Sequence, residues 1–170
     1  RGFSTAWIAL GLAHNGKGHV YTVDSNGYDD VGPQLWTRIG ARDRVIQYIG
    51  NSWDAPFPGP IDILWLDADH SGQAIIREFC HFRDRLNPRG ALVCFHDTFL
   101  DSRMPPGIQV IQDLATPACY PVRSRIALRN MRGFDMLQLL PAVPCTNPDP
   151  RPDAESLPQL QALALGLTQK

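Results

Sequence analysis

The sequence predicts an α/β fold with a Rossmann-like, doubly wound and mostly parallel sheet that ends in a C-terminal antiparallel strand pair. Three observations lead to this prediction. Short β-branched and aromatic segments alternate with segments of helical periodicity. Residues 91–95 are nearly all apolar, which is typical of a strand buried on both faces. Two further strand-like segments, 120–128 and 134–140, are joined by a short turn and therefore predict a hairpin.

The amino-terminal part of the chain predicts two helices and two strands. We expect helix, strand, helix and strand, in that order, over residues 6–13, 19–23, 33–39 and 44–49. Ser4 or Thr5 can cap the amino end of the first helix, and Pro33 suits the first turn of the second. Asp24 closes the first strand.

A proline-rich connector at residues 56–60 precedes the second half of the pattern. There we expect strand, helix, strand and helix over residues 61–66, 71–86, 91–95 and 106–115. From Pro141 onward prolines become frequent, and prolines cannot donate to a strand ladder. We therefore expect one domain over residues 1–140 and a proline-rich tail over 141–170 that can hold one short helix.

Composition excludes several classes of function. The chain has 170 residues, 44% of them hydrophobic, and a net charge of -1, so no basic surface for nucleic acid or anionic membrane is expected. No apolar run reaches the roughly 20 residues that span a bilayer. The four cysteines show no CxxC spacing, which favours reduced thiols and a cytoplasmic protein over disulfides or zinc.

Acidic and histidine residues follow two of the predicted strands at the point where each strand ends. Asp67, Asp69 and His70 follow residues 61–66, and the run His96-Asp97-Thr98 follows residues 91–95. The carboxyl ends of neighbouring parallel strands meet at the edge of an open sheet where ligands bind. The sequence therefore predicts one site from both strand ends.

Two features near the amino terminus are compatible with a nucleotide-containing cofactor. Gly2, Ser4 and Thr5 lead into a helix whose free N–H groups suit a carboxylate, although a plain helix cap explains them too. Asp24 ends a strand at a spacing typical of an acid that binds ribose hydroxyls, with Ser25 as a weaker candidate. Nicotinamide cofactors use the same geometry, and a turn cap is the structural alternative.

Taken in this order, these signals resemble the class I S-adenosylmethionine-dependent methyltransferases, and among them the small-molecule O-methyltransferases related to macrocin O-methyltransferase. The resemblance covers about residues 1–140. It implies a sheet whose last two strands form a hairpin. It also implies a first strand ahead of Gly2, so we expect that this chain is truncated at its amino terminus.

The resemblance assigns roles to individual residues. It implies S-adenosylmethionine contacts from Gly2, Ser4, Thr5, Asp24, Ser25, Asn51, Ser52 and Asp67. Asn51, Ser52 and Trp53 would border the adenine, unless they only form a turn. The resemblance further implies a Mg²⁺ site at Asp67, Asp97 and Thr98. His70 is the expected general base, with Asp67 beside it as a second catalytic residue.

Three functions remain compatible with the sequence. The first is metal-assisted O-methylation of a small hydroxylated molecule of the sugar or phenol type. The others are a non-catalytic binding module on a degenerate methyltransferase fold and a nicotinamide-dependent oxidoreductase. Asp67 and Asp97 could also act without a metal, and His96 is either a metal neighbour or a support for Asp97. We expect no nucleic-acid or membrane partner, and a homo-oligomer stays open.

Overall fold

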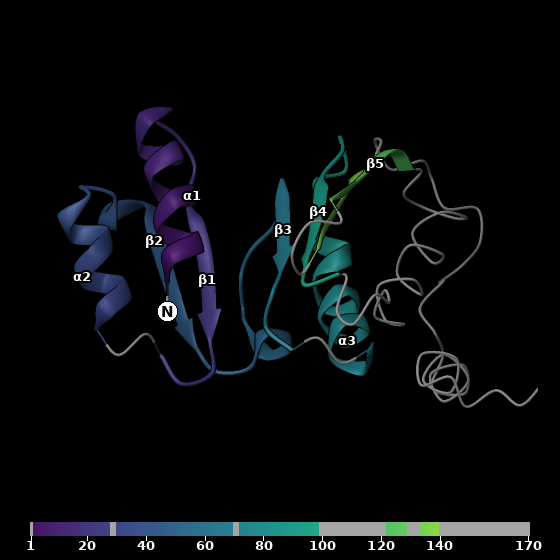
Figure 1. Ribbon diagram of the computed structural model, residues 1–170, viewed down its shortest axis with the longest axis horizontal. Helices are drawn as coiled ribbons and strands as arrows, with labels where there is room; N and C mark the ends of the chain where they lie inside the picture. Colours follow the sequence, from purple (N-terminus) through teal and green to yellow (C-terminus); the bar gives the residue numbers. More distant parts are fainter. Residues whose placement is uncertain (1, 28–29, 70–71, 99–121, 129–132, 140–170) are drawn as a thin grey trace, which may run out of the picture. The chain divides into compact units, whose positions relative to one another are not determined.

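The computed structural model describes residues 2–27, 30–69, 72–98, 122–128 and 133–139 (Figure 1). Contacts divide the chain into two compact units, Arg1–Phe57 and Pro58–Lys170. Three predicted features lie outside the described residues: His70, the helix over 106–115 and the tail over 141–170.

The first unit pairs two parallel strands, β1 (Val20–Asp24) and β2 (Val45–Ile49), in a register that runs from Val20 opposite Val45 to Asp24 opposite Ile49. Helix α1 (Phe3–His14) precedes β1, and helix α2 (Val31–Arg38) connects the two strands (Figure 1). Two short 3-10 helices, η1 (Arg42–Arg44) and η2 (Ser52–Asp54), flank β2. These elements agree with the expected order to within a few residues.

A tryptophan organises the core of the first unit. Trp36 of α2 is fully buried with the small residues Ala6, Ala9 and Ala41, and with Val45. Its indole Nε1 donates a hydrogen bond of 3.0 Å to the carbonyl oxygen of Gly2. Small residues on α1 leave room for the large ring, so the two helices can pack closely.

The start of α1 differs from the expectation. The helix begins at Phe3 with Gly2 as its N-cap, and the N-cap residue therefore supplies no side-chain capping hydrogen bond. The predicted capping by Ser4 or Thr5 is therefore wrong, because both residues lie within the first turn. The buried Thr5 hydroxyl instead lies 3.0 Å from the Thr22 hydroxyl and joins α1 to β1 by a hydrogen bond.

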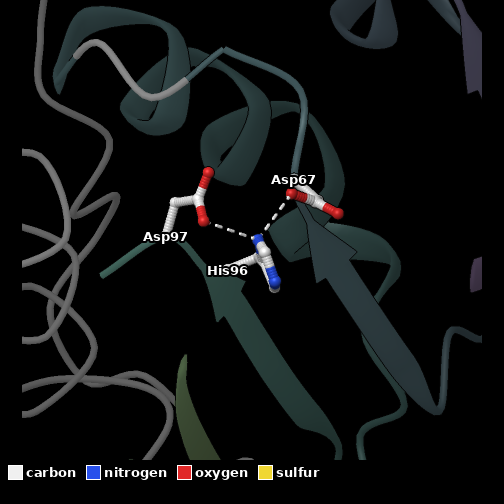
Figure 2. Close-up of side chains that lie close together, drawn as sticks. All are labelled: Asp67, His96 and Asp97. Atoms are coloured by element: carbon white, nitrogen blue, oxygen red, sulfur yellow. Dashed lines mark ion pairs between the residues drawn. The ribbon is translucent and has the colours of Figure 1, made fainter. Parts of the chain in front are cut away.

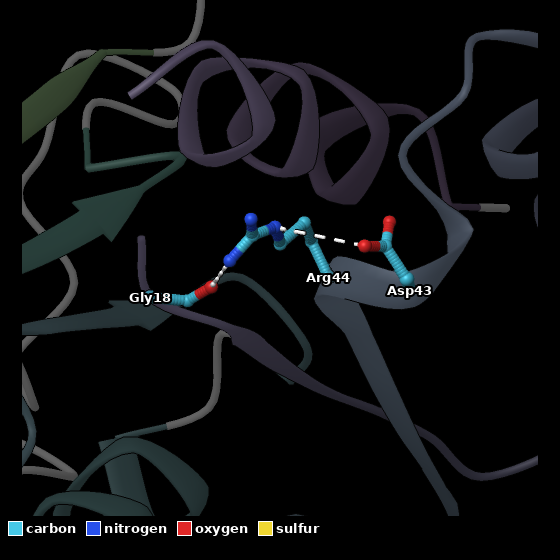
Figure 3. A network of polar contacts seen from close by, with 3 residues as sticks. All are labelled: Gly18, Asp43 and Arg44. Carbon is cyan, nitrogen blue, oxygen red and sulfur yellow. Dashed lines mark hydrogen bonds and ion pairs between the residues drawn. The ribbon is translucent and has the colours of Figure 1, made fainter. Parts of the chain in front are cut away.

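Arg44, just before β2, forms a hydrogen bond to the segment just before β1. Arg44 Nη1 donates a hydrogen bond of 3.3 Å to the carbonyl oxygen of Gly18, just before β1 (Figure 3). The neighbouring Asp43 lies 3.9 Å from Arg44 Nε, and its side chain is 75% exposed. Exposed ion pairs of this length contribute little to stability, so the contact with Gly18 is the more important one.

The second unit holds a four-stranded sheet in the order β3-β4-β6-β5. Strands β3 (Ile63–Leu66) and β4 (Leu92–His96) are parallel, and β6 (Phe134–Leu139) is antiparallel to β4 and to β5 (Val122–Leu128). Helix α3 (Gly72–Phe82) and the 3-10 turn η3 (Arg83–Arg85) connect β3 to β4. The predicted hairpin is thus confirmed, and its second strand borders β4.

The core of the second unit surrounds β4. Val93, Cys94 and Phe95 are buried, as expected for a strand covered on both faces. The other buried apolar side chains come from β3, α3, the segment between η3 and β4, and β6, namely Leu64, Leu66, Ala74, Ile75, Phe79, Phe82, Leu86, Ala91, Leu137 and Leu139. Each large apolar side chain contributes about 1.5–3 kcal/mol on burial, which fixes the strands that carry the site. Among the described residues, no helix has the length and apolar character needed to cross a membrane.

Candidate functional site

The site lies at the carboxyl ends of β3 and β4 in the second unit. Leu66 pairs with Phe95 in the parallel register, so the next residues along the two strands, Asp67 and His96, are neighbours. Asp97 follows His96 directly. Figure 2 shows the side chains of Asp67, His96 and Asp97 converging from the two strand ends. The structure therefore brings together the two acids predicted from the sequence, with a histidine between them.

The three side chains are within ligand distance of one another. His96 Nδ1 lies 3.1 Å from Asp67 Oδ1 and 2.9 Å from Asp97 Oδ1. One ligand atom from each residue lies within 4.8 Å of the other two. The side chain of Asp97 is only 5% exposed, whereas those of Asp67 and His96 are 33% and 42% exposed. The cluster is thus closed on the Asp97 side and accessible from solvent through the other two residues.

The contacts around His96 are ion pairs by distance but not hydrogen bonds by angle. Nδ1 is inaccessible to solvent and has no partner that satisfies hydrogen-bond geometry. A ring nitrogen donates or coordinates in the plane of its ring. The in-plane direction of Nδ1 therefore passes beside each carboxylate oxygen instead of pointing at it.

The backbone at Asp97 is unusual. Its φ of 55° lies in the left-handed region, which aspartate tolerates better than most residues. The next residue secures this turn: the Thr98 hydroxyl donates to Asp135 Oδ1 at 3.3 Å, and the Thr98 N–H donates to the carbonyl oxygen of Gly133 at 3.4 Å. The hydroxyl of Thr98, which was predicted as a metal ligand, therefore donates a hydrogen bond to the carboxylate of Asp135 in β6.

Two buried acids were not anticipated from the sequence. Asp135 is fully buried on β6, and Glu78 is 2% exposed on α3. The signal for Asp135 was a single acid in the strand segment 134–140, in which Gln138 is the one other polar residue. Its partner Thr98 is distant in the sequence, so no local pattern could reveal the pair.

The predicted cofactor residues of the first unit lie at the start of α1, at the end of β1 and after β2. Ser4 is exposed, and Thr5 contacts Thr22, two residues before Asp24. Asp24 Oδ1 accepts a hydrogen bond of 2.9 Å from the N–H of Asn26, so it caps the turn that contains the exposed Ser25.

The turn after β2 is closed by its own side chains. Asn51 Nδ2 donates to Asp54 Oδ2 at 3.2 Å, across the 3-10 helix that contains Ser52 and Trp53. A turn-forming role therefore accounts for the amide nitrogen of Asn51. An adenine contact from this segment stays a prediction.

The side chains present fit both expected groups. Two carboxylates and an imidazole are common ligands of divalent cations, and the three ligand atoms are close enough to share one ion. At the start of α1 the N-cap residue is a glycine and cannot cap the helix with a side chain, so the N–H groups of the first turn can bind a carboxylate such as that of S-adenosylmethionine.

The described cysteines are unsuited to nucleophilic catalysis. Burial raises the pKa of the Cys94 thiol from 9.0 to about 11. Burial also raises the pKa of Cys80, against the opposing effect of Arg83. A thiol needs its thiolate form to attack a substrate, so both residues act as packing groups at neutral pH.

Comparison with known proteins identifies the fold. The O-methyltransferase TomG from Streptomyces achromogenes, involved in tomaymycin synthesis and solved in complex with SAM, is 21% identical; the match covers 82% of this chain and 69% of TomG with a TM-score of 0.62. Cofactor-bound Rv0187 from MTB is 20% identical, with coverage of 82% and 68% and the same TM-score. A search of curated proteins gave no match.

The sequence of residues 1–98 matches the family described as methyltransferase domain. This match includes both strand ends that build the cluster of Asp67, His96 and Asp97. It covers more than half of the chain, and the structural neighbours share the same Rossmann-like fold. The chain therefore belongs to the methyltransferase domain family.

Proposed function

We propose that this chain is an S-adenosylmethionine-dependent O-methyltransferase that acts, with a divalent cation, on a small hydroxylated molecule of the sugar or phenol type. The observation that carries this proposal is the cluster of Asp67, His96 and Asp97 at the carboxyl ends of β3 and β4. TomG, which has the same fold, is named as an O-methyltransferase and was solved with SAM. That name supports the choice of oxygen as the acceptor atom.

The residues of the first unit are proposed to bind the methyl donor. The uncapped N–H groups at the start of α1, with Gly2, Ser4 and Thr5, would bind its carboxylate. Asp24, with Ser25 beside it, would accept hydrogen bonds from the ribose hydroxyls, and Asn51 and Ser52 would border the adenine. S-adenosylmethionine would supply the methyl group on a sulfonium that needs no further activation.

The residues of the second unit are proposed to bind and deprotonate the acceptor. Asp67 and Asp97 would hold the cation, for which the carboxylates alone favour Mg²⁺, and the cation would lower the pKa of the acceptor hydroxyl. His70 would accept the hydroxyl proton. The oxygen would then attack the methyl carbon, with the new O–C bond forming as the C–S bond breaks and both electrons of that bond leaving with sulfur. Alignment of the three atoms supplies much of the rate.

We also propose that the protein works in the cytoplasm. Cys80 and Cys94 are free thiols in the structure. Reduced cysteines are typical of cytoplasmic proteins, whereas secreted proteins of this size usually pair them.

Transfer of an isotopically labelled methyl group tests the proposal. The chain is incubated with labelled S-adenosylmethionine, a divalent cation and a panel of phenols, catechols and sugars. We expect labelled methyl ethers, and we expect Asp67→Asn to lower kcat/KM by about 100-fold or more, since even outer-sphere changes at metal sites cost about 10–100-fold.

Asp84→Asn is the matched control, because Asp84 is an acid of the same unit whose side chain is 71% exposed. This variant should keep the wild-type rate. An Asp67→Asn protein that methylates acceptors as fast as the wild type would contradict the proposed role of the cluster.

A further inference from the structure

The metal cluster contains a nitrogen ligand that the sequence resemblance did not assign. The resemblance implies Asp67, Asp97 and Thr98, which is a set of oxygen ligands only. In the structure the Thr98 hydroxyl donates to Asp135, and His96 Nδ1 lies between the two carboxylates instead. The three atoms closest to a shared centre are therefore two oxygens and one imidazole nitrogen.

The distances agree with coordination of one ion. Two ligand atoms at right angles around an ion, each about 2.1 Å from it, lie about 3.0 Å apart. His96 Nδ1 is 3.1 Å from one carboxylate oxygen and 2.9 Å from the other. In such an arrangement the lone pair of each ligand atom points at the ion and not at the neighbouring ligand atoms. The contacts of Nδ1 show this feature, because neither has the angle of a hydrogen bond.

The ligand types decide which ions the cluster prefers. Mg²⁺ binds carboxylate, carbonyl and water oxygens, whereas imidazole suits first-row transition metals. Replacing an oxygen ligand by a nitrogen ligand should therefore shift the preference from Mg²⁺ towards Mn²⁺, Fe²⁺ or Co²⁺. The exposure of Asp67 and His96 leaves the solvent side of such an ion open for acceptor oxygens.

We infer that His96 is a metal ligand through Nδ1. The cluster is then a site for a divalent first-row transition metal, and it binds Mg²⁺ more weakly. This inference rests on the proposed function, since it concerns the cation of the same site. It adds a ligand and the class of metal.

Metal binding to the unmodified chain provides the first test. Mn²⁺, Co²⁺ and Mg²⁺ are each titrated into the apoprotein by calorimetry. We expect Mn²⁺ and Co²⁺ to bind about 10-fold or more tightly than Mg²⁺. Pulsed electron paramagnetic resonance of the Mn²⁺-loaded protein should show coupling to an imidazole nitrogen. Tighter binding of Mg²⁺, or no nitrogen coupling, would overturn the inference.

Substitutions separate the ligand role of His96 from a structural one. His96→Ala should weaken Co²⁺ binding about 10-fold or more and remove the nitrogen coupling. His96→Asp replaces the nitrogen ligand by a carboxylate oxygen and should reverse the metal preference in favour of Mg²⁺. His19→Ala is the control, because His19 is an exposed histidine of the first unit, and it should change neither quantity. Unchanged Co²⁺ affinity in a folded His96→Ala protein would contradict the assignment.

Binding of S-adenosylmethionine to the same samples distinguishes the two levels of the proposal. If the methyl donor binds but the metal preference is for Mg²⁺, the inference about His96 fails and the proposed function stands. If the transition metals bind as expected but the donor does not, the metal site stands and the proposed function fails.

Discussion

At the scale of single residues, the pair of Thr98 and Asp135 joins the end of β4, where the site lies, to β6. Both side chains are fully buried, and the hydroxyl of Thr98 donates to the carboxylate at 3.3 Å. A buried carboxylate is costly unless it accepts hydrogen bonds. The contact therefore stabilises the acid and also secures the residue next to Asp97, whose backbone has a φ of 55°.

Removal of this hydroxyl should destabilise the second unit. Thr98→Val keeps the shape of the side chain but takes one donor from the buried carboxylate, so we expect a loss of about 1–3 kcal/mol in the free energy of unfolding. Urea denaturation measures this loss. Thr98→Ser, which retains the hydroxyl, should recover most of it, and a Thr98→Val protein as stable as the wild type would show that the contact contributes nothing.

The raised pKa of Cys94 predicts a dependence of stability on pH. The thiol ionises above about pH 9 in the unfolded chain but only near pH 11 in the folded protein, so the folded state binds more protons in between. Stability should thus be unaffected by this group below pH 9 and should fall as the pH rises from 9 to 11. Urea denaturation at pH 8 and pH 10 should show a loss of roughly 1 kcal/mol relative to Cys94→Ala.

A parallel pH dependence in the wild type and Cys94→Ala would contradict this account. The same burial should slow alkylation. At pH 8 the folded protein should react with iodoacetamide at Cys94 about 100-fold more slowly than the urea-unfolded chain, because the thiolate fraction is lower by that factor.

The sequence predicted Asp67 and Asp97 correctly as neighbours because strand ends follow from local pattern. It could not assign the third member of the cluster. Thr98 and His96 flank Asp97, where the backbone turns with a φ of 55°; the Thr98 hydroxyl donates to Asp135, whereas His96 lies 3.1 Å from Asp67. That turn depends on Gly133 and Asp135, which are distant in the sequence.

At the scale of elements, the start of α1 shows how a helix end is fixed without a capping side chain. Gly2 has a φ of 80°, and its carbonyl oxygen accepts a hydrogen bond from the Trp36 indole. A Cβ at this position would lie 3.0 Å from both the Trp36 ring and the Gly32 backbone. Only glycine therefore fits both the backbone and the space.

Two glycine substitutions separate these effects. Gly16 has a φ of 71°, and a Cβ added there would meet nothing within 4 Å. Gly16→Ala should cost only the strain of the left-handed backbone, about 1–2 kcal/mol. Gly2→Ala should cost a further 1–3 kcal/mol or so, because the Trp36 ring must move, and it should weaken S-adenosylmethionine binding.

Thermal unfolding and calorimetry of the two variants measure both effects. Equal losses of stability would show that the contact of Gly2 with Trp36 is not restrictive. Unchanged donor affinity in Gly2→Ala would remove the start of α1 from the proposed donor site.

The elements themselves were largely predictable, since periodicity and turn residues are local. The features that the sequence did not predict are the exact ends of helices and the order of strands in the sheet. The predicted helix over 71–86 ends at Phe82 and continues as a 3-10 turn over Arg83–Arg85, a difference that the apolar spacing does not report. Likewise, no local pattern states that β6 and not β5 borders β4.

At the scale of the whole molecule, the chain carries the methyltransferase fold at low sequence identity. TomG is 21% identical at a TM-score of 0.62, so the two chains share the fold although most side chains differ. The fold fixes the strand ends, but the acceptor and the metal depend on individual side chains. The proposed chemistry must therefore be tested on those side chains.

Calorimetric titration of S-adenosylmethionine into the folded chain tests the central claim most directly. We expect saturable binding that Asp24→Asn weakens about 10-fold or more, since ribose contacts need the carboxylate, while the retained Oδ1 still accepts from Asn26. Asp43→Asn, at an acid with a 75% exposed side chain in the same unit, should bind like the wild type. Absence of binding to a chain that unfolds cooperatively would contradict the account.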